Sequence, residues 1–157
     1  MSYRTLKSDD IEVFSEAIGH FFATVTEERA NVRSAYLLEQ PEPIVWGDFN
    51  GVITVDGGYV GSLTFSAPRA LLSHVLLHMG EKQLSDEHHR DVVGEIANTL
   101  SGWTRRHFGE GLRISPPRAF GGRSQSVEKL AKSAPYAIPL RWKHYEANLV
   151  VHLDVVG

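Results

Sequence analysis

Hydrophobic residues recur every three or four positions in three segments of the chain, which is the spacing of a helix that buries one side. The first predicted helix begins at Ser8 or Asp9, either of which can act as its N-cap, and ends near Glu27. The second has Pro68 in its first turn and is stopped by Gly80. The apolar positions are Ile11, Phe14, Ile18, Phe21, Phe22 and Val25 in the first helix, and Leu71, Leu72, Val75, Leu76 and Met79 in the second.

Extended segments occupy most of the remaining apolar parts of the sequence. Their predicted ranges are 35–38, 44–55, 59–65, 112–120, 136–141 and 148–155. Asp56-Gly57-Gly58 predicts a tight hairpin between two of them, because glycine accepts the positive φ of such turns. The order of helices and strands predicts an α+β fold, in which long helices cover a mainly antiparallel sheet. It also indicates two copies of an αβββ unit, joined by the second helix.

The third predicted helix begins at Ser85, its N-cap, and runs to about Phe108, where Gly109 and Gly111 end it. The His88-His89 pair in its first turn is expected to be solvated. At about 100° per residue, one sector is apolar and faces the core. The apolar sector contains Val92, Val93, Ile96, Ala97, Leu100, Trp103 and Thr104, and the opposite sector contains Asp91, Glu95, Asn98, Gly102 and Arg105.

Glu95 and Asn98 are three positions apart, so both project from the same face of this helix. The carboxylate is charged, and the carboxamide can both donate and accept hydrogen bonds. Gly94, Ser101 and Gly102 lie beside them with little or no side chain, although an interior glycine costs a helix roughly 0.5–1 kcal/mol relative to alanine. This combination favours the close approach of another surface. For an arbitrary Glu-x-x-Asn, the alternative is an ordinary solvated helix face.

Composition narrows the class of protein. The chain has 157 residues, of which 42% are hydrophobic, and this is enough for a single domain over residues 1–157. A formal net charge of −3 with scattered basic residues argues against a nucleic-acid partner. The absence of cysteine excludes disulfides and thiolate catalysis. No apolar run approaches the ~18 residues of a membrane span, so we expect a cytoplasmic protein that does not contact a membrane.

The string GEIANTLSG, followed after a short loop by LRISPPRAFGG, resembles the motif region of the CheX/CheC/FliY family of response-regulator phosphatases. Members of that family carry a Glu-x-x-Asn on a long helix, a glycine shortly after it, and then a proline-containing strand with a glycine-rich turn. The matching residues are Glu95, Asn98, Gly102, Pro116 or Pro117, and Gly121-Gly122. Trp103 departs from the pattern, because a polar residue is more usual there. The nearest string in the first helix, Glu16-Ala17-Ile18-Gly19, lacks the Asn, so the chain resembles the single-site CheX type.

The resemblance implies a phosphatase that docks on a phosphorylated CheY-like receiver domain and accelerates hydrolysis of its aspartyl phosphate. Asn98 would orient the attacking water, and Glu95 would pair with the receiver's lysine. Mg²⁺ would belong to the receiver, and no cofactor would be bound by this chain. The expected partner-binding residues around the pair are Asp91, Gly94, Ser101, Gly102 and Arg105. The family also implies a homodimer through sheet edges, with the apolar last strand, 149–156, as the expected open edge.

Other interpretations of the sequence stay open. A protein of the same fold can bind a receiver without hydrolysing its phosphate. His74 and His78, four positions apart on the second helix, could both touch a metal, although no third ligand is evident for a metal hydrolase. Asp91 and Glu95 could be considered an acid–base pair, but a convex helix face lacks the apolar pocket that would separate their pKa values.

Overall fold

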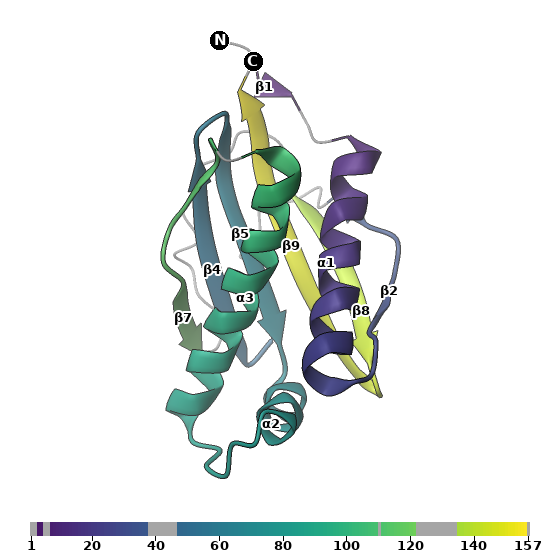
Figure 1. The fold of residues 1–157 in the computed structure, drawn as a ribbon, viewed down its shortest axis with the longest axis vertical. Coiled ribbons are helices and arrows are strands. Elements are labelled where there is room, and N and C mark those ends of the chain that lie inside the picture. Colours follow the sequence, from purple (N-terminus) through teal and green to yellow (C-terminus); the bar gives the residue numbers. More distant parts are fainter. Residues whose placement is uncertain (1–2, 5–6, 38–46, 110, 122–134, 157) are drawn as a thin grey trace.

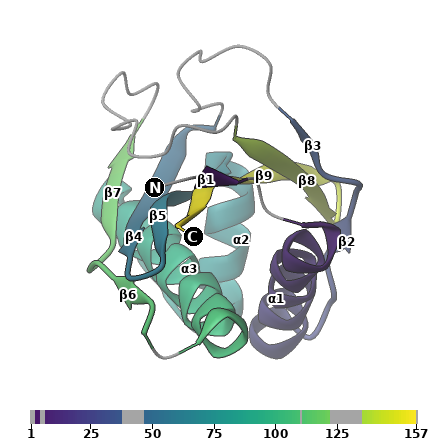
Figure 2. The same cartoon turned by 90° about the horizontal axis from the view of Figure 1, so that it is seen from above.

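The computed structural model describes residues 3–4, 7–37, 47–109, 111–121 and 135–156. In this part of the chain, three helices pack against a single antiparallel sheet (Figure 1). Helices α1 (Ser8–Thr26) and α3 (Asp86–Phe108) run side by side along the sheet, and the shorter α2 (Arg69–His78) lies near one end of α3. Figure 2 shows that α1 and α3 lie on the same side of the sheet. None of the described helices is both long and apolar enough to cross a membrane.

Nine described strands form the sheet, and every pair of neighbours is antiparallel, which confirms the predicted α+β class. The central order is β2-β8-β9-β5-β4-β6, while β1 pairs with β9, β3 with β8, and β7 with β4. The strands are β1 (Tyr3–Arg4), β2 (Asn31–Val32), β3 (Tyr36–Leu37), β4 (Phe49–Asp56), β5 (Tyr59–Ala67), β6 (Arg113–Ile114), β7 (Arg118–Gly121), β8 (Tyr136–Trp142) and β9 (Tyr145–Val156).

The strand order is symmetric between the two halves of the chain: replacing each strand with its counterpart in the other half gives the same order, reversed. The first half contributes α1 and β2 to β5, and the second half contributes α3 and β6 to β9. The central strands β5 and β9 pair with each other, while β2 and β3 lie on β8, and β6 and β7 lie on β4. The outer strands of each half therefore form their hydrogen bonds with a strand of the other half. The two related halves agree with the predicted repeat joined by α2. After its long helix, each half contributes four described strands rather than three, because β2 was not predicted and the range 112–120 forms both β6 and β7.

Strand β9 lies in the middle of the sheet, so the expectation that the last strand is an open edge is wrong. It pairs with β5 on one side, and with β8 and then β1 on the other side. Leu149 and Val151 are fully buried on one face, and Val150 is 1% exposed on the other. Its largely apolar sequence after Asn148 is typical of a strand that is covered on both faces rather than of an edge strand.

The hydrophobic core lies between the sheet and the helices. Its large members include Phe14, Ile18 and Phe22 from α1, Ile96 and Leu100 from α3, Leu71 and Leu72 from α2, and Ile53, Leu63, Phe65, Ile138 and Trp142 from the strands. The hydrophobic spacing therefore identified the buried side of each long helix correctly.

Several boundaries differ from the predicted ones for local reasons. Lys7, rather than Ser8 or Asp9, is the N-cap of α1, and its backbone N–H donates to the carboxylate of Asp10 at 3.1 Å. The predicted strand 112–120 is two strands, β6 and β7, because residues 116 and 117 are prolines without an N–H to donate. Strand β2 was not predicted. Residues 38, 44–46 and 122, which were assigned to strands or a turn, lie outside the described residues.

Candidate functional site

Glu95 and Asn98 are both exposed on the outer face of α3, as the spacing predicted. Asp91 and Arg105 are exposed on the same helix, and Gly102 is half-buried. Neither Glu95 nor Asn98 makes a hydrogen bond or an ion pair with any other residue in the described part of the chain. Both side chains are therefore available to another molecule.

The predicted ends of α3 are confirmed. The Ser85 hydroxyl accepts a hydrogen bond from the His88 backbone N–H at 3.2 Å, which satisfies one of the free donors at the helix start. The last helical residue is Phe108, and the Gly109 N–H donates to the Arg105 carbonyl at 2.9 Å. The site thus lies well inside a helix of 23 residues, away from its fraying ends.

Gly94 and Ser101 are buried, so the expectation that they share the exposed face is wrong. The Ser101 hydroxyl is fully buried and donates to the Ala97 carbonyl at 2.8 Å. A Cβ at Gly94 would lie 3.5 Å from the Cβ of Pro117 and 3.8 Å from that of Ala119. Both residues are on the buried side of α3, and Gly94 faces Pro117 and Ala119, where α3 contacts β7. They position the helix on the sheet, and Gly102 alone of the three is partly exposed.

Gly51 of β4, which was not among the predicted site residues, brings the sheet close to α3. A Cβ at this position would collide with the backbone carbonyl of Val93, and it would lie 3.1 Å from the Cα of Gly94. The backbone of β4 and that of α3 therefore meet directly, two residues before Glu95. A glycine inside an otherwise apolar strand marks such close approach of another backbone, and this signal was present in the sequence.

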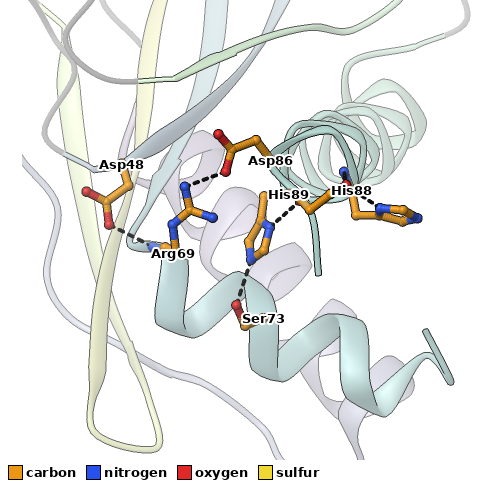
Figure 3. Close-up of polar contacts among 7 residues, drawn as sticks. Asp48, Arg69, Ser73, Asp86, His88 and His89 are labelled. Carbon is orange, nitrogen blue, oxygen red and sulfur yellow. Dashed lines mark hydrogen bonds and ion pairs between the residues drawn. The ribbon is translucent and has the colours of Figure 1, made fainter. Parts of the chain in front are cut away.

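His89 anchors the start of α3 and is only 1% exposed, which corrects the expectation that it is solvated. Figure 3 shows its ring between α3 and α2. Nδ1 lies 2.6 Å from the Ser85 carbonyl and must donate to it, because a carbonyl only accepts. Nε2 lies 2.6 Å from the Ser73 hydroxyl, and the ring stacks on Phe49 at a centroid distance of 5.3 Å. One side chain therefore ties α3 to α2 and β4.

Arg69, the first residue of α2, makes a second link to α3 (Figure 3). Its guanidinium lies 2.6 Å from the Asp86 carboxylate, and its backbone N–H donates to the Asp48 carboxylate at 2.8 Å. The hydrogen bond and the charge of Arg69 lower the pKa of Asp86. Because this pair is exposed, we assign it a role in orienting the helices rather than a large share of stability.

The two histidines of α2 belong to an aromatic cluster. The rings of His74 and His78 stack at 5.5 Å, both meet Trp142 edge-on, and His74 Nδ1 lies 3.3 Å from the Tyr145 hydroxyl. Burial, followed by the charge of Lys143, lowers the pKa of His74. Within the described residues, no group of three or more His, Cys, Asp or Glu side chains is placed to hold a metal. The geometry gives the metal-hydrolase interpretation no support.

The corresponding position in α1 offers no second pair. Glu16 is exposed, but the residue three positions later, Gly19, is buried. The guanidinium of Arg29 lies over Gly19, only 2.6 Å from where its Cβ would be. The first helix therefore presents neither a carboxamide nor an open surface at this point.

Comparisons with known proteins identify the family and agree with the fold. The family model of the chemotaxis phosphatase CheX matches residues 49–141, which include β4, the whole of α3 and most of β8. No curated protein sequence matches the chain. The fold is similar to that of a putative chemotaxis protein from Desulfovibrio vulgaris Hildenborough, at 21% identity and a TM-score of 0.80 over 92% of this chain and 96% of that one.

Two further solved structures show the same fold. The chemotaxis protein CheX of Desulfovibrio desulfuricans is 20% identical, with a TM-score of 0.80 over 94% of this chain and 99% of that one. A CheX–CheY–BeF3–Mg²⁺ complex from Borrelia burgdorferi contains a chain that is 15% identical, with a TM-score of 0.73 over 94% of this chain and 99% of that one. The family model covers more than half of the residues, including both members of the exposed pair. The chain therefore belongs to the CheX family.

Proposed function

We propose that this protein is a phosphatase that docks on a phosphorylated CheY-like receiver domain and accelerates hydrolysis of its aspartyl phosphate. The observation that carries the proposal is the exposed, unpartnered pair Glu95 and Asn98 on a helix tied to α2 and β4. Family membership supports it. So does the structural similarity to a CheX that was solved in a complex with CheY, BeF3 and Mg²⁺.

In this proposal, the groups needed for catalysis come from two proteins, and this chain supplies those on the exposed face of α3. The receiver would supply the phosphoryl group, Mg²⁺ and a lysine, which together neutralise the charge that develops in phosphoryl transfer. Asn98 would supply a carboxamide that accepts a hydrogen bond from water and holds it in line for attack. This is catalysis by positioning, and it needs neither a nucleophile nor a general base from this chain. Glu95 would pair with the receiver's lysine and fix the position of Asn98.

Anchoring of α3 supports this assignment. A carboxamide that orients water must be held to within a fraction of an ångström, and the His89 and Gly51 contacts restrict movement of the helix relative to the sheet. Around the pair, we assign partner contact to the exposed Asp91 and Arg105 and to the half-buried Gly102. Gly94 and Ser101 would act indirectly, Gly94 by letting α3 pack close to Pro117 and Ala119, and Ser101 as a buried residue of the helix.

The test is hydrolysis of a receiver phosphorylated with a small phosphodonor, with and without the protein. Asn98→Ala should lower the dephosphorylation rate by at least about 10²-fold, a loss of roughly 3 kcal/mol of transition-state stabilisation. Its binding to a receiver trapped with beryllofluoride should weaken far less. Glu95→Ala should lose affinity as well as rate, because truncating one side of an interfacial charge pair costs about 2–5 kcal/mol.

Thr99→Ala is the matched control, because Thr99 is the exposed neighbour of Asn98 on the same turn. It should leave the rate within about twofold of the wild type. A folded Asn98→Ala protein that still accelerates hydrolysis fully would remove Asn98 from the mechanism. The second candidate, a receiver-binding module without activity, would then be preferred if the trapped receiver still binds.

We also propose a homodimer formed through a sheet edge, and the structure changes which edge is available. Strand β9 is internal, whereas β3 pairs only with β8 among the described strands. Tyr36 and Leu37 of β3 are 50% and 47% exposed, so this edge strand presents two large side chains that a partner could cover. The β3 edge is therefore the better candidate for the dimer contact.

A further inference from the structure

An open hollow of about 730 Å³ continues the exposed face of α3 beyond Asn98. It is lined by Gly102, Arg105, Arg106, Gly109 and Ile114. Gly102 lies one helical turn after Asn98, so the hollow begins where the proposed phosphoryl site ends. Gly102 and Gly109 have no side chains that could fill the hollow, and a Cβ built on either would meet no atom within 4 Å.

Arg106 is held at this hollow by an aromatic support. Its guanidinium lies 5.7 Å from the ring centroid of Trp103, and that ring in turn packs against His20 of α1 at 4.7 Å. Trp103 is the residue that departs from the family pattern. Arg106 has no carboxylate within ion-pair distance among the described residues, whereas the neighbouring His107 lies 3.3 Å from Asp10.

Basic residues in the last turn of a helix are common, because they complement the partial negative charge of its carbonyl groups. That effect explains why Arg106 is positively charged. It does not explain why the guanidinium lies over the Trp103 ring beside a hollow. A guanidinium stacked on an indole loses less conformational freedom when it binds, so it is prepared to receive a ligand.

The charges along the exposed face of α3 change sign on either side of Asn98. Asp91 and Glu95 precede it, and Arg105 and Arg106 follow it. At 1.5 Å per residue, Glu95 and Arg106 are roughly 16 Å apart along the helix axis. A partner seated over Asn98 would therefore meet negative charge at one end and positive charge at the other.

We propose that the hollow receives an acidic side chain of the receiver, and that Arg106 pairs with it and thereby fixes the direction in which the receiver lies along α3. This rests on the proposed function, since it places the receiver over Asn98. A carboxylate is the chemistry that matches a supported guanidinium, which can donate two parallel hydrogen bonds to it. With the receiver's lysine on Glu95, the two contacts of opposite sign would exclude the reversed orientation.

The test is charge reversal at Arg106, with Arg141→Glu as the matched control. Arg141 is also an exposed arginine, and it lies on β8, away from α3. Binding is measured with a CheY-like receiver trapped with beryllofluoride and Mg²⁺, and turnover with the same receiver phosphorylated by acetyl phosphate. Arg106→Glu should raise Kd and KM at least about tenfold and leave kcat within about twofold. Arg141→Glu should change all three by less than about twofold.

Two further variants distinguish a docking contact from a structural one. Arg106→Gln should raise Kd about fivefold and flatten its dependence on salt concentration, because one screened charge contact is removed. Trp103→Asn should raise Kd about threefold, since Arg106 keeps its charge but loses its support. Circular dichroism spectra of all variants should match that of the wild type.

Equal effects of Arg106→Glu and Arg141→Glu would overturn the proposal, because net charge alone would then explain the loss. A fall in kcat with unchanged Kd would also overturn it. The binding measurement does not depend on hydrolysis, so it tests the hollow even if the phosphatase assignment fails. Conversely, Asn98→Ala could lose activity while Arg106→Glu keeps both its activity and a normal Kd. That outcome would overturn the proposed role of the hollow in docking and leave the proposed function intact.

Discussion

Gly94 and Gly102 are both interior glycines of α3, and replacing each with alanine separates helix stability from partner contact. A Cβ at Gly102 would meet no atom within 4 Å. At Gly94 it would lie 3.5 Å from the Cβ of Pro117 and 3.8 Å from that of Ala119, which are ordinary van der Waals distances. Neither substitution creates a clash, so each mainly removes the conformational freedom of glycine from a helix.

Both variants should be more stable than the wild type. Alanine is favoured over glycine in a helix interior by about 0.8–1.0 kcal/mol. For a domain of this size, a gain of about 1 kcal/mol raises Tm by roughly 2–4 °C. Thermal unfolding followed by circular dichroism should give an increase of that size for Gly94→Ala and for Gly102→Ala.

Activity should respond only to the change at Gly102. This residue lies one turn after Asn98 and is partly exposed, so a methyl group there would hold a docked receiver away from the carboxamide. We expect kcat/KM for receiver dephosphorylation to fall about tenfold, equivalent to about 1.4 kcal/mol. Gly94→Ala should stay within about twofold of the wild type. A stabilised Gly102→Ala protein with full activity would refute the reasoning that this surface needs close approach.

The remaining predictions concern packing, pH, metal and assembly. Gly51→Ala should lower the free energy of unfolding by about 1–3 kcal/mol in urea denaturation, because its Cβ would collide with the Val93 carbonyl. Burial and the charge of Lys143 hold the pKa of His74 below its ordinary value of 6.5. The stability contribution of neutral His74 is therefore complete above pH 6.5 and is lost as pH falls toward the lowered pKa, and His74→Gln should remove this part of the pH dependence. Metal analysis should find no stoichiometric zinc, and a variant with alanine at His74 and His78 should keep its activity. Light scattering should give twice the 17.5 kDa mass of the chain, and a monomer mass at micromolar concentration would contradict the dimer.

Elements that depend on neighbouring residues could be predicted from the sequence. Ser85 caps α3, Gly109 ends it, and Gly57 and Gly58 form the turn between β4 and β5 with φ of 90° and 91°. The exposure of Glu95 and Asn98 followed from helical spacing alone. These features need no knowledge of what lies elsewhere in the fold.

Features that depend on distant residues could not be predicted in this way. Gly94 and Ser101 lie at the border between the two faces of α3, and packing against distant parts of the fold decides that they are buried, as Pro117 and Ala119 do for Gly94. His89 is buried because Ser73 and Phe49 surround its ring. The apolar pattern of β9 was read correctly as a strand, but its place in the sheet depends on pairing with β5, far away in the sequence.

The exchange of outer strands between the two halves has a consequence for how this chain can fold. Asn31 pairs with Arg141, and Asn50 pairs with Phe120, so neither half can complete its own sheet. The arrangement resembles a domain-swapped dimer contained within one polypeptide. Such non-local pairing is slow to form, because long loops must close before any edge strand is stabilised. Folding is thereby coupled across the whole chain, and the helix that displays Asn98 cannot be seated until the strands of both halves have come together.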